Sequence, residues 1–227
     1  MKTLVLSLGG SLIIPDNVDI AFLENFRRII EKHKNKYKFV FVTGGGSVAR
    51  KYISALRKAG KSEYLQSMIG ISTTRTNARF LTYIFGKDAN EGIPHDMKQV
   101  KNLLLKNDII FCGALRYAEK ETSDATAAKL ANYLKTEFIN LTLVSGLYTK
   151  NPLKYKNAKF IPKISWQDFY EKANKEKFKP GQHFVLDQSA SKIIRDYRIK
   201  TYILGKNLKN LDNFLSGKKF AGTIIEG

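Results

Sequence analysis

Residues 38–47 read KFVFVTGGGS, an apolar run of β-branched and aromatic residues that stops at three consecutive glycines. Residues 3–11, TLVLSLGGS, repeat this arrangement near the start of the chain. After the triple glycine, the stretch SVARKYISALRKAG (47–60) is typical of a helix, which Gly60 closes. A strand that passes through a glycine loop into a helix indicates βαβ units, and ligands of such sheets gather at the carboxyl ends of the strands.

The remainder of the chain continues to alternate short apolar runs with helical spacing. Asp19 is placed to cap a helix in which Ile20, Leu23 and Phe26 recur on one face. No repeat or low-complexity linker interrupts the pattern, so we expect one domain over residues 1–227. The predicted fold class is α/β, a three-layer αβα sandwich around a mostly parallel central sheet. Further helices are predicted over 63–85, 96–105, 123–134, 165–174 and 188–197, and further strands over 108–113, 138–144, 200–205 and 222–226.

The chain is strongly basic, with 39 lysines and arginines against 20 acidic residues and a formal net charge of +19. Such a balance attracts phosphates, whether they belong to nucleotides or to nucleic acid. The lysines, however, are dispersed among polar residues, which is typical of a solvated surface, and no nucleic-acid motif is recognisable. We expect no nucleic-acid partner, although a nucleic-acid binder stays open as an alternative.

A single cysteine, Cys112, excludes an intrachain disulfide and a multi-cysteine metal site. It lies in the apolar run IIFCG, where a buried structural thiol is expected. The first residues lack a small-residue cleavage site, and no apolar stretch approaches the length of a membrane span. These observations predict a cytoplasmic protein without a membrane partner.

The two glycine loops have the chemistry of a phosphate site. Glycine lets the main chain approach a phosphate closely, so that successive N–H groups point at one anion, and a helix that begins near Ser47 adds its positive end. Neither loop matches a dinucleotide fingerprint or a P-loop, and a single glycine pair at a strand end can be only a tight turn. Arg50, one helical turn further on, is expected to project toward the same space, the alternative being a surface arginine paired with a carboxylate.

A second polar segment, Thr122–Ser123–Asp124, precedes an alanine-rich helix. Taken alone, Ser123 or Asp124 is best explained as the helix cap. The small residues that follow would let this helix lie close to the sheet or to a ligand. In that case Asp124 could orient the catalytic groups or hydrogen bond to an acceptor.

The order of these motifs resembles the archaeal-type uridylate kinases of the amino acid kinase family. The resemblance runs nearly from end to end and rests on GGS, VTGGGSVARKYI (42–53), IGISTTRTNA (69–78), TSDATAA (122–128) and VSGLYTKNP (144–152) with a closing GTII. It implies the amino acid kinase fold and transfer of the γ-phosphoryl group of ATP to UMP in pyrimidine nucleotide biosynthesis. Mg²⁺ would be held through nucleotide phosphates, without a dedicated protein site. It also suggests a homo-oligomer, a hexamer built from dimers, with 63–85 as a natural interface.

The resemblance assigns roles to individual residues. The N-terminal part of the chain would bind the acceptor and the C-terminal part ATP. Asp124 matches the family's organising aspartate, and Arg50 would act with it in catalysis. ATP would contact Gly10, Ser11, Gly46, Arg50, Thr142, Tyr148 and Asn151, and UMP would contact Gly45, Ser67, Arg75, Gly113, Thr122 and Ser123.

Several positions depart from the family pattern. Ser7 stands where many members have a lysine, although the archaeal uridylate kinase branch often lacks it too. Ser67 replaces an acidic residue expected to bind UMP, while Leu143, Ser145 and Asn151 replace polar or acidic residues on the ATP side. These changes leave nucleotide binding better supported than the identity of the acceptor.

The sequence alone therefore leaves other functions open. The same fold could phosphorylate isopentenyl phosphate, carbamate or an amino acid carboxylate, or the chain could bind or store nucleotides without catalysis. Three residues are discounted as catalytic candidates: His183 is interpreted as a loop or packing residue, Asp187 as the cap of the helix that follows it, and Lys192 as a surface lysine.

Overall fold

A central sheet of seven strands organises the computed structural model, which describes residues 1–118, 121–175 and 186–227. The strand order is β3-β2-β1-β4-β8-β9-β7. From β3 to β8 every neighbouring pair is parallel, whereas β9 runs antiparallel to β8 and pairs in parallel with β7. The prediction of a mostly parallel sheet is confirmed. The strands are β1 Lys2–Leu8, β2 Tyr37–Thr43, β3 Ile109–Cys112, β4 Phe138–Leu141, β7 Lys163–Ile164, β8 Thr201–Leu204 and β9 Thr223–Ile225.

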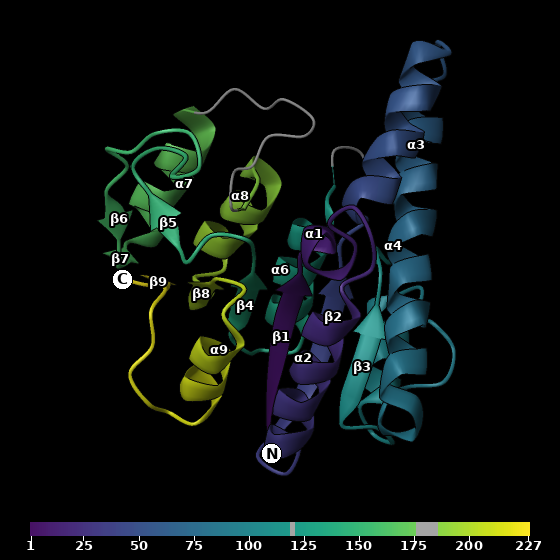
Figure 1. Ribbon diagram of the computed structural model, residues 1–227, viewed down its shortest axis with the longest axis horizontal. Coiled ribbons are helices and arrows are strands. Elements are labelled where there is room, and N and C mark those ends of the chain that lie inside the picture. Colours follow the sequence, from purple (N-terminus) through teal and green to yellow (C-terminus); the bar gives the residue numbers. More distant parts are fainter. Residues whose placement is uncertain (119–120, 176–185) are drawn as a thin grey trace.

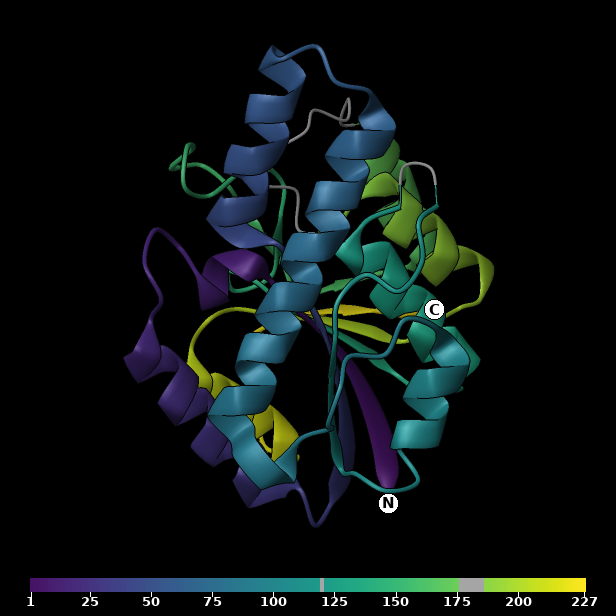
Figure 2. The same ribbon diagram turned by 90° about the vertical axis from the view of Figure 1, so that its right-hand side faces the viewer.

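Helices cover both faces of this sheet, and α3 runs side by side with α4, the longest helix of the described chain (Figures 1 and 2). The predicted helix over 63–85 is confirmed residue for residue. The four-residue helix α1, the two-residue strand β7 and a small β5–β6 hairpin were not predicted, because each is too short to show a periodic pattern. The helix α9 was also missed, although Leu208, Leu211 and Leu215 recur at helical spacing after its cap, Asn207. The helices are α1 Gly10–Ile13, α2 Ile20–His33, α3 Gly46–Lys58, α4 Glu63–Phe85, α5 Met97–Leu103, α6 Ser123–Tyr133, α7 Trp166–Lys175, α8 Gln188–Asp196 and α9 Leu208–Leu215; the hairpin pairs β5 Leu147–Tyr148 with β6 Phe160–Ile161.

Alternation along the strands divides the apolar core into two layers. In β1, Leu4, Leu6 and Leu8 pack toward α2, α4 and α9, whereas Val5 packs toward α5, α6, α7 and α8. Successive residues of a strand face opposite sides, and a parallel sheet is buried on both, so the apolar run of β1 serves both layers. The three-layer αβα architecture is therefore confirmed (Figure 2).

Two local predictions were wrong. The strand predicted over 138–144 ends at Leu141; the N–H of Thr142 still donates to the carbonyl of Leu204, and the chain then bends away from β8. The cap of α6 is neither Ser123 nor Asp124: the hydroxyl of Thr122 accepts from the N–H of Ala125. Asp124 thus lies inside the first turn of α6, and its carboxylate is not occupied by capping.

Other predictions are confirmed. Asp19 caps α2, Asp187 caps α8, and Gly60 follows α3 with φ of +67°. Cys112 is fully buried, and burial raises the pKa of its thiol to about 12. Lys192 lies at the surface and forms an ion pair with Asp196 at 2.6 Å, whereas His183 lies outside the described residues.

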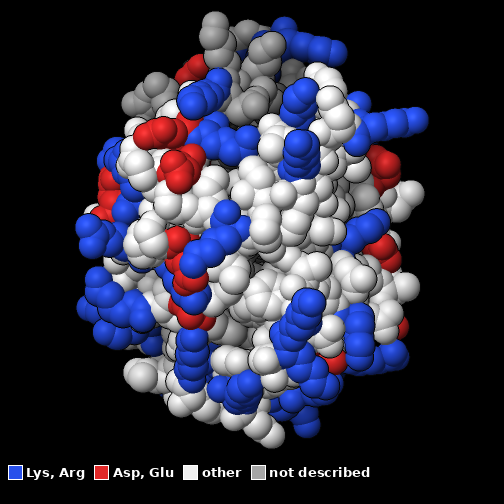
Figure 3. Space-filling view, turned by 90° about the vertical axis from the view of Figure 1, so that its left-hand side faces the viewer, with Lys and Arg blue, Asp and Glu red and all other residues white. Residues whose placement is uncertain are grey.

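The charged side chains are dispersed over the surface. Figure 3 shows lysines and arginines spread over one face of the molecule, with acidic side chains between several of them. Glu226, for example, pairs with Lys163 and with Lys200. None of the helices in the described part of the chain combines the length and the apolar character that a membrane crossing requires.

One carboxylate links α9 to α2. Oδ1 of Asp212 lies 2.8 Å from Nζ of Lys32 and 2.8 Å from Nε2 of the buried His33. Hydrogen bonds from Lys32 and from His33 lower the pKa of Asp212 to about 2. The ionised form of Asp212 therefore stabilises the contact between the two helices.

We expect Asp212→Asn to lower the free energy of unfolding by about 1 kcal/mol at pH 7, because Lys32 is well solvated and only the His33 contact is buried. The folded-state pKa is depressed, so the difference from the unchanged protein is complete above the usual aspartate pKa of about 3.9 and disappears as the pH falls toward 2. Urea unfolding at several pH values measures it. Glu24→Gln, an exposed change on α2, is the control, and a difference independent of pH would contradict the assignment.

Candidate active site

The glycine loops that follow β1 and β2 touch through their main chains. A Cβ atom built on Gly10 would lie 2.0 Å from the nitrogen of Gly46, and one built on Gly44 would lie 2.6 Å from the nitrogen of Gly10. Gly46 also has φ of +65°, which side chains rarely adopt. No residue with a side chain fits these positions without moving one loop away from the other.

Pairing in the sheet brings the loops together. β1 and β2 are parallel neighbours whose last residues, Leu8 and Thr43, are in register. The N–H of Gly44 donates to the carbonyl of Leu8 at 2.9 Å, and the buried Asn77 of α4 donates its side-chain N–H to the carbonyl of Gly44 at 2.7 Å. α3 begins at Gly46, so its positive end faces this junction. The two loops thus form a main-chain surface suited to an anion.

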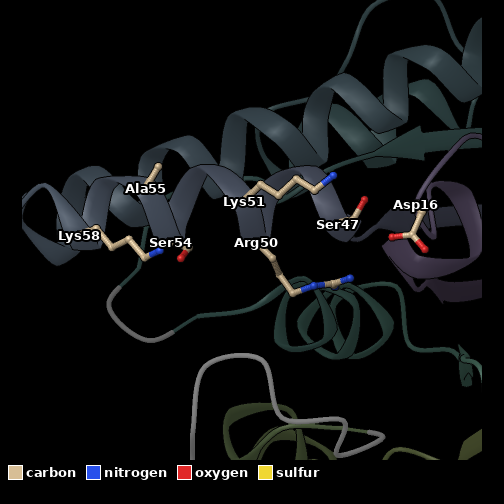
Figure 4. Close-up of a pocket in the computed structure, with 7 residues that line it drawn as sticks. All are labelled: Asp16, Ser47, Arg50, Lys51, Ser54, Ala55 and Lys58. Carbon is tan, nitrogen blue, oxygen red and sulfur yellow. The ribbon is translucent and has the colours of Figure 1, made fainter.

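Arg50 extends from α3 beside the junction. Its Nη1 lies 3.5 Å from Oγ of Ser11, at the long limit for a hydrogen bond, and it forms no ion pair within the described residues. The predicted projection toward the loops is confirmed, and the alternative of a surface pairing with a carboxylate is not. Arg50 borders an open groove of about 530 Å³ along α3 (Figure 4), lined by Asp16, Ser47, Arg50, Lys51, Ser54, Ala55 and Lys58.

Asp124 lies at the other side of the junction, in the first turn of α6. Its Oδ1 accepts from Oγ of Ser7 at 2.5 Å and from Nδ2 of Asn140 at 3.2 Å. Burial, and after it the charge of Asp187, raise the pKa of Asp124 to about 7, although the hydrogen bond from Ser7 lowers it. Near neutral pH, Asp124 can therefore change its protonation state when a ligand changes the local charge.

The N-terminal ends of α6 and α8 are linked at this site. Thr122 caps α6 and donates its hydroxyl proton to Asp187, whose other oxygen caps α8 through the N–H of Ala190 at 2.9 Å. The half-buried Ser123 is the first residue of α6. The link fixes the two helix ends beside Asp124.

On the β3 side, α4 positions the loop that begins at Gly113. A Cβ on Gly113 would lie 2.5 Å from the nitrogen of Arg75, so the loop crosses α4 in close contact. The guanidinium of Arg75 donates to the carbonyls of Ala114 and Leu115, and its burial lowers the pKa of Arg75. Arg75 therefore holds the loop in place. Ser67 lies two turns earlier on α4, about 12 Å along the helix axis, without a side-chain hydrogen bond among the described residues.

The residues predicted for the ATP side follow β4. Thr142 is fixed to β8 through its N–H, and the ring of Tyr148 packs edge-on against Phe160 with centroids 5.3 Å apart. Asn151 accepts from the N–H of Leu153 at 2.9 Å, so its side-chain oxygen is used in a turn. The structure thus brings Gly10, Ser11, Gly44–Gly46 and Arg50 together, and no hydrogen bond joins Thr142, Tyr148 or Asn151 to them within the described chain.

Asn140 was missed by the sequence analysis, and Ser7 was noted only as a departure from a family pattern. Both are buried polar residues inside otherwise apolar strands, LVLSL and FINL. A polar residue at a buried position requires a hydrogen-bond partner, so each interruption was a usable signal. The partner, Asp124, is more than a hundred residues from Ser7 and could not be read from spacing.

The chain matches the model of the amino acid kinase family over residues 2–205. It belongs to that family. Its relatives include the uridylate kinases of Thermococcus kodakarensis and Thermoplasma volcanium, each 34% identical, over 98% and 99% of this chain and 99% and 98% of theirs.

Solved structures of uridylate and UMP kinases have a fold similar to that of this chain. The crystal structure of uridylate kinase from Archaeoglobus fulgidus matches with a TM-score of 0.84 at 32% identity, covering 99% of this chain and 100% of that one. The UMP kinase of Ureaplasma parvum, 19% identical with a TM-score of 0.78, supports the fold alone. The amino acid kinase fold predicted from the sequence is therefore confirmed.

Replacing Gly10 in this family member by alanine tests the contact between the loops. The added Cβ would meet the nitrogen of Gly46, so we expect Gly10→Ala to lower the free energy of unfolding by at least about 1–3 kcal/mol. Gly70→Ala is the matched control, because Gly70 lies within α4 and its Cβ would meet only the flexible end of Ile53 at 3.4 Å. The control should be neutral or stabilising by about 0.5–1 kcal/mol. Equal thermal stability of the two variants would show that the loops have room between them.

Proposed function

We propose that this chain is a uridylate kinase, an enzyme that transfers the γ-phosphoryl group of ATP to UMP and releases ADP and UDP. The observation that carries the proposal is the match to uridylate kinases over nearly the whole length of both chains. The interlocked glycine loops, with Arg50 beside them, supply the phosphate-binding surface that such a reaction requires. By the same reasoning the enzyme serves pyrimidine nucleotide biosynthesis.

The reaction would proceed by positioning and by charge stabilisation. Gly10, Ser11 and Gly46 would bind the phosphates of ATP through the main chain, with Arg50 neutralising the charge that develops on the transferred group. Asp124 would orient the reacting groups from α6. Thr142, Tyr148 and Asn151 would bind the remainder of ATP.

UMP would lie over Gly45, between α4 and the loop that begins at Gly113. Thr74 and Arg75 hold this loop, the former by accepting from the N–H of Ala114 at 2.9 Å. In this proposal Arg75 acts on UMP largely by fixing that loop, since its donors are already used by main-chain carbonyls. Ser67, Thr122 and Ser123 complete the predicted UMP side.

Mg²⁺ would enter with the nucleotide. On the α3 side the glycine junction presents main-chain N–H donors and the guanidinium of Arg50, which suit phosphate oxygens and not a cation. Asp124, on the α6 side, is a single carboxylate and, among the described residues, is not part of a cluster that would hold the ion by itself. Phosphate oxygens would therefore hold the ion, as is usual for this cation. When bound, the ion would neutralise phosphate charge during transfer.

Three properties of the whole protein complete the proposal. Residues 1–227 would act as one domain, with the acceptor in the N-terminal part and ATP in the C-terminal part. The enzyme would work in the cytoplasm, where ATP and UMP are available, without a nucleic-acid partner. Its chains would assemble as a hexamer built from dimers through α4, which exposes Tyr64, Leu65 and Tyr83.

A coupled ADP-release assay with ATP and Mg²⁺ tests the proposed function. UMP, CMP, isopentenyl phosphate and acetylglutamate are offered separately, and we expect turnover with UMP and little with the others. Turnover with another acceptor in place of UMP would reassign the substrate. No turnover with any of them, while ATP still binds, would remove the kinase assignment.

Arg50→Ala should lower kcat with UMP roughly 100-fold, the usual cost of removing one group that stabilises transition-state charge. Its thermal stability should stay close to that of the unchanged protein, since Arg50 is exposed. Arg57→Ala removes another exposed arginine from α3 and is the matched control. Unchanged turnover in Arg50→Ala, or an equal loss in both variants, would exclude Arg50 from the site.

A further inference from the structure

Two buried polar side chains of the sheet, Ser7 and Asn140, contact Asp124. Ser7 and Asn140 are register partners on the neighbouring parallel strands β1 and β4, so they point to the same face. Their exposed fractions are 1% and 3%. Two residues earlier on each strand, Val5 and Phe138 occupy the same face and belong to its apolar core.

Both side chains donate to the same atom. Oγ of Ser7 and Nδ2 of Asn140 reach Oδ1 of Asp124 at 2.5 and 3.2 Å, whereas no described residue hydrogen bonds to Oδ2. Two donors on one oxygen fix the rotation of the carboxyl group and leave its second oxygen available. Asp124 is half-buried, so that second oxygen can meet a ligand in the site.

The stability of the fold alone does not explain an asparagine at position 140. Its Oδ1 is buried without a hydrogen-bond partner, the one such side-chain atom in the described part of the chain. A buried acceptor without a partner costs folding free energy, and an apolar residue of similar volume would avoid that cost. Residues that cost stability are retained where they serve the site.

The hydrogen-bond donors to Asp124 carry no charge. Ser7 of β1 and Asn140 of β4 are uncharged, and Asp187, which caps α8, is of like charge. No lysine or arginine among the described residues forms an ion pair with Asp124. The hydrogen bonds from the sheet therefore favour the ionised form against burial and against Asp187.

We propose that Ser7 and Asn140 are positioning residues of phosphoryl transfer, which favour the ionised form of Asp124 and orient it through one oxygen so that the other faces the reacting phosphates. The role in transfer rests on the proposed kinase function. The effect of Ser7 and Asn140 on the protonation of Asp124 is a property of the ligand-free protein and can be measured without turnover.

Asn140→Leu separates positioning from stability. We expect its Tm to be equal to or above that of the unchanged protein, kcat with UMP to fall about tenfold or more, and KM for UMP and ATP to change less than about twofold. Thr201→Val is the matched control: it removes a buried hydroxyl from β8 that, among the described residues, bonds only to the carbonyl of Ile199, so Tm should fall and kcat should persist. If leucine overpacks the site, Asn140→Val makes the same test with a smaller side chain.

Ser7→Ala tests directly whether the hydrogen bond from Ser7 favours the ionised form of Asp124. Infrared titration distinguishes a protonated carboxyl group from a carboxylate, and the signal absent from Asp124→Asn identifies Asp124. We expect the ratio of protonated to ionised Asp124 at pH 7 to rise about tenfold in Ser7→Ala, a shift of about one pH unit, and to rise also in Asn140→Leu. Thr201→Val should leave it unchanged.

The proposal is overturned if neither Ser7→Ala nor Asn140→Leu moves the titration of Asp124, or if Asn140→Leu keeps its kcat. It is also overturned if kcat falls only as far as Tm falls. If the unchanged protein has no kinase activity but the titration of Asp124 still moves in both variants, the effect of Ser7 and Asn140 on Asp124 is supported. The proposed function is then contradicted.

Discussion

Main chain meets main chain where the loops after β1 and β2 converge, and the remainder of the site is arranged around that contact. Gly10 and Gly46 approach so closely that neither position has space for a Cβ atom. Parallel pairing of β1 with β2 supplies the register, and α3 begins at the same point. The result is a surface of N–H groups at a helix end, which is suited to an anion without depending on long, flexible side chains.

Charge is distributed unevenly about this junction. Arg50 lies on the α3 side and Asp124 on the α6 side. Among the described residues, no carboxylate pairs with Arg50 and no lysine or arginine pairs with Asp124. A bound nucleotide would place its negative phosphates beside Arg50. A cation held by those phosphates would favour the ionised form of Asp124. The +19 charge of the whole chain contributes a general attraction for such ligands but does not locate them.

Much of this arrangement could be predicted from the sequence. The glycine loops, the helix over 63–85 and the projection of Arg50 follow from local patterns, since a strand, a loop and a helix are each specified by adjacent residues. The cap of α6 was assigned to Ser123 or Asp124 because three short polar residues in a row are equivalent by type, and only the backbone geometry selects Thr122. Asn140 could not be linked to Asp124, because the contact depends on how β4 and α6 pack in three dimensions.

The most direct test of phosphate binding at the glycine junction is a crystal structure of the protein with UMP and a non-hydrolysable ATP analogue. We expect the terminal phosphates of the analogue to lie against the main-chain N–H groups of Gly10 and Gly46, with Arg50 within hydrogen-bonding distance. The UMP phosphate should lie over Gly45. A triphosphate bound elsewhere, for example along the outer groove of α3 with the glycine junction free of ligand, would contradict it.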